Sequence, residues 1–221
     1  MLLSFKTRLE PNNKQRTAFR KAAGTARHAD NWGNALIREI LKLRETDKSV
    51  KVPSAIDLHK HLIAQVKPEN PWYYETNKNV PQKALADLRT AWKRCFSKVS
   101  AQPRFKKKGV GDSFYLESGT KAKPRIKNDG RRIKLPSIGW VKLSEPLPVT
   151  AVHNCVISRT ADEWFIAIKY EGCIDTGTLL VPDGGEFHRD SLWSGQTLLS
   201  TERSHDEAES KRHSPDLYRD G

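Results

Sequence analysis

The spacing of apolar residues changes once along the chain, and that change restricts the folds it can adopt. Residues 14–99 repeat their apolar positions at helical spacing, whereas residues 112–170 alternate apolar with polar positions. A short alternating segment at residues 2–9 precedes the helical region. One strand, then helices, then a run of strands predicts an α+β fold, in which a small, OB-like β-barrel carries a helical insertion after its first strand.

The insertion begins with one long and one short predicted helix. Pro11-Asn12-Asn13 ends the first strand and can cap a helix over residues 14–45. Gly24 and Gly33 weaken this helix or admit a close neighbour, and a break at one of them is compatible with the pattern. The second helix is predicted over residues 54–66.

Residues 79–99 have the clearest helical period of the chain. Asn79 can cap this third helix, and Pro81 lies in its first turn. One apolar stripe runs along it, made by Ala84, Leu85, Leu88, Ala91, Trp92, Cys95, Phe96 and Val99.

The alternating part of the sequence predicts five or more strands. The first covers residues 112–117. Asn128-Asp129-Gly130 is typical of a hairpin turn and joins residues 125–127 to residues 132–135. Further strands are predicted over residues 140–143, 152–159 and 164–170.

The charge of the chain is split between its two parts. Residues 1–170 carry 34 Lys and Arg against 15 Asp and Glu, a net of +19, whereas residues 171–221 carry 5 against 11, a net of −6. A basic surface on an ordered scaffold predicts a polyanionic partner, and nucleic acid is the first candidate. Past Tyr170 the apolar residues lose their pattern, so we expect a disordered tail.

Composition excludes several other classes of protein. No apolar run approaches the roughly 18–20 residues of a membrane span, and no signal peptide is recognisable, which predicts a cytoplasmic chain without a membrane partner. Cys95, Cys155 and Cys173 form no CxxC pair, which argues against a disulfide framework and a structural zinc site. No catalytic constellation, metal site or cofactor motif is recognised, so no such residue is predicted.

Four basic features are candidates for binding nucleic acid. The first is a run at the junction of helix and strand, where cations can neutralise phosphates and Phe105 can either stack a base or dock on the barrel. The second is the predicted hairpin, whose cations form either a backbone clamp or a solvated edge. The candidates of these two features are Arg104, Phe105, Lys106, Lys107 and Lys108, then Arg125, Lys127, Arg131, Arg132 and Lys134.

The other two features are pairs at helical spacing. Arg27 and Asn31 lie beside Gly24, where a close approach is possible. Lys78 and Gln82 lie at the start of the third helix, a position that favours phosphate and base edges, although exposed polar side chains are the simpler interpretation. Lys93, Arg94 and Lys142 complete the predicted contacts.

Several motifs resemble the N-terminal half of the TnpB/OrfB proteins of transposable elements, which are RNA-guided nucleases. The resemblance covers residues 3–171. It is carried by Arg8-Leu9-Glu10-Pro11, Gly24-Thr25-Ala26-Arg27 with Asn31-Trp32, Pro71-Trp72-Tyr73, Ala91-Trp92-Lys93, Pro103-Arg104-Phe105-Lys106-Lys107, Ile133 to Lys142 and Val156-Ile157-Ser158-Arg159.

The resemblance implies a domain organisation and a set of partners. Residues 1–10 and 101–171 would form the family's wedge barrel, and residues 11–100 its helical recognition lobe with a helix-turn-helix. Guide RNA and double-stranded DNA would be the partners, with Lys78 and Gln82 near the short DNA motif beside the target.

The resemblance ends before the nuclease domain of the family. Residues 172–221 contain neither the three acidic residues nor the zinc ribbon of the family, and Asp175 is a poor match to the first acid. A truncated, non-cleaving member with a frameshift near Gly185 is therefore predicted. Two alternatives stay open: the binding half of a split nuclease with a separately encoded catalytic half, and a helix-turn-helix DNA-binding regulator.

Overall fold

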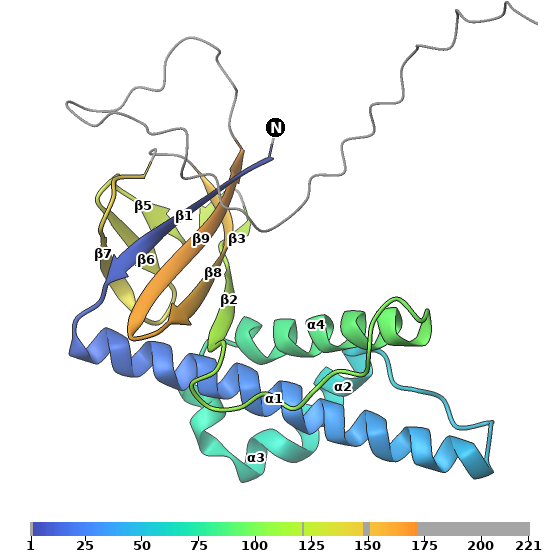
Figure 1. The fold of residues 1–221 in the computed structure, drawn as a ribbon. Helices are drawn as coiled ribbons and strands as arrows, with labels where there is room; N and C mark the ends of the chain where they lie inside the picture. The colour runs from blue at the N-terminus through green and yellow to red at the C-terminus, as the bar shows by residue number, and fades with distance from the viewer. Residues whose placement is uncertain (1, 121, 148–150, 172–221) are drawn as a thin grey trace, which may run out of the picture. The chain divides into compact units, whose positions relative to one another are not determined.

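One strand, a set of helices and a run of strands follow one another along the described chain (Figure 1). The computed structural model describes residues 2–120, 122–147 and 151–171. The predicted α+β class and the order of its elements are confirmed. The predictions for residues 172–221, including Cys173, Asp175 and the frameshift near Gly185, lie outside the described residues.

Helix α1 (Asn13–Thr46) is a single unbroken helix of 34 residues. Asn12 caps it, accepting a hydrogen bond from the Gln15 backbone at 2.9 Å, while the Gln15 side chain accepts one from the Asn12 backbone. The break considered at a glycine does not occur. Gly33 serves as the close approach instead, because an added Cβ would lie 2.8 Å from Leu85 Cδ2 and 2.9 Å from Leu88 Cδ2.

The second predicted helix is divided into shorter pieces. Residues 55–66 form α2 (Ala55–His61) and the π-helix η1 (Leu62–Val66), and α3 (Lys67–Glu69) and the 3₁₀ helix η2 (Pro71–Glu75) follow beyond the predicted end. Proline in this segment removes a backbone donor, which favours such irregular turns. None of the described helices is long and apolar enough to cross a bilayer.

Helix α4 (Asn79–Phe96) carries the predicted apolar stripe, with two corrections. Lys78 rather than Asn79 precedes the helix, and it makes no side-chain capping bond. The stripe is buried through Trp92, but Phe96 is 46% exposed and Val99 lies beyond the last helical residue. The Phe96 ring packs beside Trp92 at a centroid distance of 5.4 Å, so the stripe ends where α4 leaves its neighbours.

The main sheet contains β1 (Leu2–Glu10) at its centre. Its order is β2-β8-β9-β1-β7-β6-β5, and all its pairs are antiparallel. The other strands are β2 (Ser113–Glu117), β5 (Lys127–Asn128), β6 (Arg132–Leu135), β7 (Gly139–Leu143), β8 (Val152–Thr160) and β9 (Glu163–Glu171).

The predicted closure into a barrel is wrong. The edge strands β2 and β5 are not paired with each other, and β3 (Gly119–Thr120) and β4 (Lys123–Pro124) form a separate two-stranded sheet between them. Ser118 links the two edges instead: its carbonyl accepts from Arg125 N at 2.6 Å and its hydroxyl from Ile126 N at 3.3 Å. A few hydrogen bonds to one buried serine thus stand where strand pairing between β2 and β5 would close a barrel. The sheet therefore stays open.

The sheet and the helices share one hydrophobic core. Phe19 of α1 is fully buried, with its ring centroid 5.1 Å from that of Trp164 and 5.9 Å from that of Phe114. Farther along, α1 packs against α4, as Figure 1 shows. The long helix therefore connects the end of the sheet to the helical region and fixes their mutual position.

Candidate nucleic-acid interface

Residues 103–112, which we call the strap, lead toward β2 without helix or strand structure, turn at residues 108–111 and are fastened to α1. The Pro103 carbonyl accepts hydrogen bonds from Asn34 Nδ2 at 3.1 Å and Arg38 Nη2 at 2.7 Å. Asn31 binds the backbone of Lys106 in both directions, at 2.7 and 3.0 Å. Side chains of a helix thus hold a segment that has no regular hydrogen bonding of its own.

Asn34 connects the strap to the core. Its side chain is fully buried, and its Oδ1 accepts a hydrogen bond from Trp92 Nε1 of α4 at 3.1 Å. The same amide donates to Pro103. One buried amide therefore joins α1, α4 and the strap, and both of its polar atoms have partners.

Two ion pairs fix the strap farther along. Arg27 Nη1 lies 2.6 Å from Asp112 Oδ1, and Lys106 Nζ lies 2.9 Å from Asp30 Oδ1. Burial raises the pKa of Asp30, although the hydrogen bond from Lys106 opposes that shift. Arg27, Asn31 and Lys106, three of the predicted contacts, are therefore engaged within the protein.

Three cations of the strap stay exposed. Arg104, Lys107 and Lys108 have no ion-pair partner within the described part of the chain. Phe105 is half exposed and lies under the Arg38 guanidinium, 5.0 Å from its ring centroid. The ring contact that the structure shows for Phe105 is thus with α1, and stacking of Phe105 on a base stays a prediction.

A second basic surface is the outer face of β5–β7, made by Lys127, Arg132, Lys134, Trp140 and Lys142. Lys134 lies opposite Lys127 on one side and Trp140 on the other. The residues that alternate with them on β6, Ile133 and Leu135, are buried, which confirms the predicted alternation. Like charges opposite each other reduce the stability of a sheet, and a bound polyanion would offset that cost.

The cations of this face differ in their partners. Arg132 pairs with Asp129 at 2.8 Å and lies 5.4 Å from the Trp140 ring centroid, while Lys142 pairs with Glu10 at 3.0 Å. Lys127 and Lys134 are exposed without an ion-pair partner among the residues described. Arg125 and Arg131 are exposed beside this face.

The remaining predicted contacts lie at opposite ends of α4. Lys78 and Gln82 are exposed at its start, beside β2, where Asn79 Nδ2 donates to Glu117 at 3.2 Å. Lys93 and Arg94 are exposed in the last turn. At the helical rise, Lys78 and Lys93 are roughly 22 Å apart along the axis, so the candidates do not form a single cluster.

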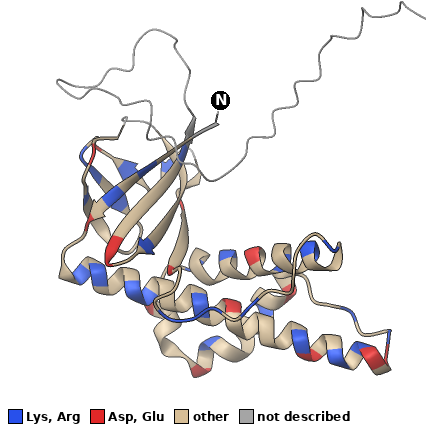
Figure 2. Ribbon diagram, in the orientation of Figure 1, with Lys and Arg blue, Asp and Glu red and all other residues tan. Residues whose placement is uncertain are grey.

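Figure 2 shows these cations distributed over the strap, α1 and the strands of the sheet. In the described ranges, no three His, Cys, Asp or Glu side chains gather closely enough to hold a metal ion. The exposed Lys and Arg side chains of these surfaces can contact phosphates, and exposed aromatic rings beside them can stack on bases.

Sequence reasoning missed the residues that position the strap. Asp30, Asn34 and Arg38 are not among the residues predicted above. A fully buried asparagine on the apolar side of a helix is unusual, and that position is the signal that could have identified Asn34.

Two comparisons with known proteins find similar sequences. Residues 1–45 match the family model HTH_OrfB_IS605, described as a helix-turn-helix domain. Over 179 residues the chain is 31% identical to "Putative RNA-guided DNA endonuclease InsQ" of Escherichia coli (strain K12). That match covers 79% of this chain and 42% of InsQ, so the chain spans less than half of its relative. The resemblance to TnpB/OrfB proteins is confirmed.

Proposed function

Because the chain matches the N-terminal part of the TnpB/OrfB family, we propose that it binds guide-like RNA and DNA for a transposon-associated nuclease without cutting them itself. In this proposal residues 1–10 and 101–171 act as a wedge, and residues 11–100 as a helical recognition lobe. The observation that carries the proposal is the strap, which presents Arg104, Lys107 and Lys108 from a fixed backbone.

Fixing the backbone matters because phosphate contacts otherwise cost conformational entropy. A flexible basic segment must be ordered when it binds, whereas the bonds from Asn31, Asn34 and Arg38 order the strap during folding. The side chains of its exposed cations still have to be ordered, but the chain that carries them does not. This arrangement favours binding over a purely solvating role for the basic run.

The outer face of β5–β7 supports a nucleic-acid partner independently. Trp140 is 41% exposed on β7, beside β6 with Arg132 and Lys134, and Lys127 lies opposite Lys134 on the far side of β6. An exposed aromatic ring among cations can stack a base while the cations contact phosphates. Two such surfaces on one scaffold are suited to a long or folded polymer better than to a small anion.

The salt dependence of binding tests the proposal. Filter binding would measure the affinity of the full chain for a structured RNA and for a duplex DNA over a range of salt concentrations. Replacing Arg104, Lys107 and Lys108 by Gln removes up to three phosphate contacts, so the slope of log K against log salt should fall by about 2–3. The matched control replaces Lys42, Lys48 and Lys51, which are exposed cations outside both surfaces.

The outcomes separate the candidate functions. An equal loss of slope in the control triple would show that net charge alone drives binding and would overturn the role of the strap. Tight binding to one duplex sequence without any RNA preference would favour a DNA-binding regulator. Strand cleavage by the purified chain in magnesium would contradict the non-cutting role.

A further inference from the structure

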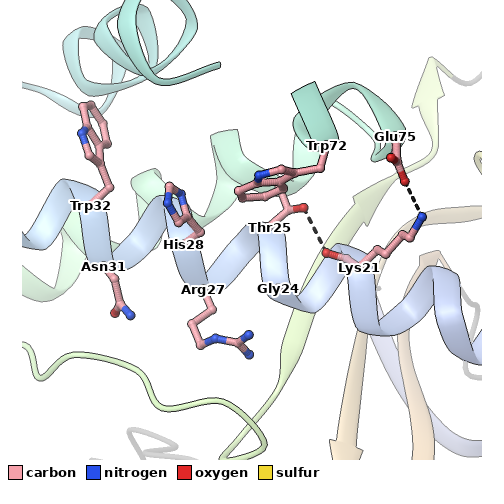
Figure 3. A pocket seen from close by; sticks show the side chains of 9 residues that line it. All are labelled: Lys21, Gly24, Thr25, Arg27, His28, Asn31, Trp32, Trp72 and Glu75. Carbon is pink, nitrogen blue, oxygen red and sulfur yellow. Dashed lines mark hydrogen bonds and ion pairs between the residues drawn. The ribbon is translucent and has the colours of Figure 1, made fainter. Parts of the chain in front are cut away.

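The face of α1 between the strap and η2 contains a pocket of about 690 Å³ (Figure 3). Trp32, His28 and Trp72 supply its aromatic side, whereas Arg27 and Asn31 point toward the strap. The volume lies within the range of pockets that bind small molecules, so one nucleotide fits.

Trp72 provides a rigid aromatic surface in this pocket. Its ring stacks on Tyr73 with a centroid distance of 4.3 Å and an angle of 25°, and the His28 ring meets it edge-on at 5.1 Å. Trp72 nevertheless remains 37% exposed. An aromatic ring that is fixed by its neighbours and still accessible can stack an unpaired base without first being ordered.

The charges around the pocket favour a neutral group inside it. Lys21 is paired with Glu75, and Arg27 is paired with Asp112 at 2.6 Å. His28 Nδ1 lies 2.8 Å from the Tyr73 hydroxyl, and burial lowers the His28 pKa, which favours the neutral ring. A phosphate would therefore find no unpaired cation among the pocket residues, whereas a planar base would find aromatic surface.

Unpaired cations lie next to the pocket rather than in it. Asn31 lines the pocket and also binds the backbone of Lys106, the residue that precedes Lys107 and Lys108. A sugar–phosphate chain that follows these lysines would carry its bases past the pocket. The phosphates would thus be contacted by the strap, and the base would enter the adjacent pocket.

Among the described residues, no side chain covers the backbone of α1 at Gly24, which lines the pocket. A Cβ added there would meet only Arg27 Nη2, at 3.8 Å. The space above Gly24 is open, so a flat group can approach α1 closely. A larger side chain at this position would obstruct the pocket without disturbing the packing on the other side of α1.

We propose that this pocket receives a single unpaired nucleobase, stacked on Trp72, from a nucleic-acid strand whose phosphates lie along the strap. This inference rests on the proposed function, since it needs a nucleic-acid partner. It adds a position on α1 at which a base is accommodated individually.

Photocrosslinking tests the inference. The probe is a short single-stranded RNA containing 5-iodouracil, with a DNA of the same sequence and a duplex as parallel arms. We expect crosslinks mapped by mass spectrometry to Trp72 with a single strand and none there with the duplex, because paired bases stay stacked. The RNA and DNA arms establish which strand supplies the base.

Two variants make the test specific. Gly24→Leu keeps Trp72 but places a branched side chain in the open space above residue 24, and leucine is a strong helix former, so the chain should fold, lose the crosslink and bind the single strand about tenfold more weakly. Tyr74→Leu is the matched control, because Tyr74 is 66% exposed in the same η2 helix but does not line the pocket. It should retain the crosslink and the affinity.

The failures of the two proposals can be distinguished. Salt-sensitive RNA binding with crosslinks only at other residues, or with an undiminished Trp72 crosslink in Gly24→Leu, would overturn the base pocket and leave the proposed function intact. Absence of binding to every probe at low salt would overturn both.

Discussion

The strap and the outer face of β5–β7 are both basic and exposed, but they obtain their geometry in different ways. The hairpin strands align their cations by their own ladder, in which Lys127 and Trp140 flank Lys134. The strap has no ladder, and Asn31, Asn34 and Arg38 of α1 hold its backbone.

This difference shows which kind of site local sequence can predict. In a strand, the alternation of apolar and polar residues over a few positions shows which side chains face outward. The outer face of β5–β7 could therefore be predicted from the sequence. The strap depends on contacts between residues 65–75 positions apart, which no local pattern encodes. The same difference makes the strap vulnerable to substitutions in α1 that leave the outer face unchanged.

The largest expected effect comes from Asn34→Ala. This change leaves the buried Trp92 indole N–H without an acceptor and removes one donor to Pro103. We expect the free energy of unfolding to fall by about 3 kcal/mol, measured by urea denaturation. Gln102→Ala, an exposed amide beside the strap, is the control and should change stability by less than about 0.5 kcal/mol.

Hydrogen exchange on Asn34→Ala would then test whether the strap, unlike the outer face of β5–β7, depends on α1 for its order. Amide protection should fall along the strap more than in β6 and β7. Equal loss in both regions would show that the two surfaces are a single cooperative unit.

The next effect distinguishes two glycines of the helix that carries the strap. Gly33→Ala places a methyl group against Leu85 and Leu88, which are buried and would have to shift within the core, so we expect a loss of about 1–2 kcal/mol. Gly24→Ala adds a methyl group in open space and should gain about 0.5–1 kcal/mol. Thermal denaturation of both variants measures the difference. A gain of stability in Gly33→Ala would contradict the packing described at Gly33, and a loss in Gly24→Ala would contradict the open space at Gly24.

A smaller effect is expected from Asn31→Ala, which releases only the middle of the strap. Lys106 loses two backbone hydrogen bonds, but the ends of the strap remain held. We expect the free energy of RNA binding to weaken by about 1 kcal/mol, while the circular dichroism spectrum of the folded chain is unchanged. Lys134→Gln, on the outer face, should instead lower the salt slope by roughly 0.7 for a single strand, without a change at the strap. If Asn31→Ala binds as the wild type does, rigidity of the strap is irrelevant to affinity.

The smallest effect is a pH dependence that arises on the α1 side. Burial lowers the pKa of His28 below its ordinary value of 6.5, so the unfolded chain binds a proton that the folded chain rejects. The stabilising contribution is complete above pH 6.5 and is lost as the pH falls toward the folded pKa. His28→Gln should therefore flatten the decline in unfolding free energy between about pH 7 and pH 5. An unfolding free energy that depends on pH in His28→Gln as it does in the wild type would contradict this role of His28. Burial also lowers the pKa of His59, so some pH dependence should remain in the variant.

The sequence predicted most of the fold because its patterns are local. The strand at residues 2–9, the long helix and the Asn12 cap follow from period and capping chemistry. Barrel closure was wrong because it depends on whether two distant edges pair, and here Ser118 and a short hairpin intervene. The helix over residues 54–66 changes to a π-helix after His61, which neither spacing nor propensity indicates.

For the candidate site, the sequence predicted the types of residue that are exposed better than it predicted their arrangement in space. Lys107, Lys108, Lys127 and Lys134 are exposed, as a basic surface requires. Arg27 and Asn31 were chosen for their spacing beside Gly24, yet both are bound to other parts of the chain. Polar residues at helical spacing look alike in sequence whether they meet solvent or a distant loop, and only the path of the strap separates the two cases.

The central position of β1 has a consequence for synthesis on the ribosome. The first strand of the described unit pairs along nearly its whole length with β9, whose residues are the last of that unit to be made. Until Glu163–Glu171 leave the exit tunnel, β1 lacks its principal partner, and the apolar face of the sheet stays incomplete. The nascent chain must therefore delay completion of its sheet until almost the entire unit has been translated, and premature termination before that point would leave a strand open to aggregation.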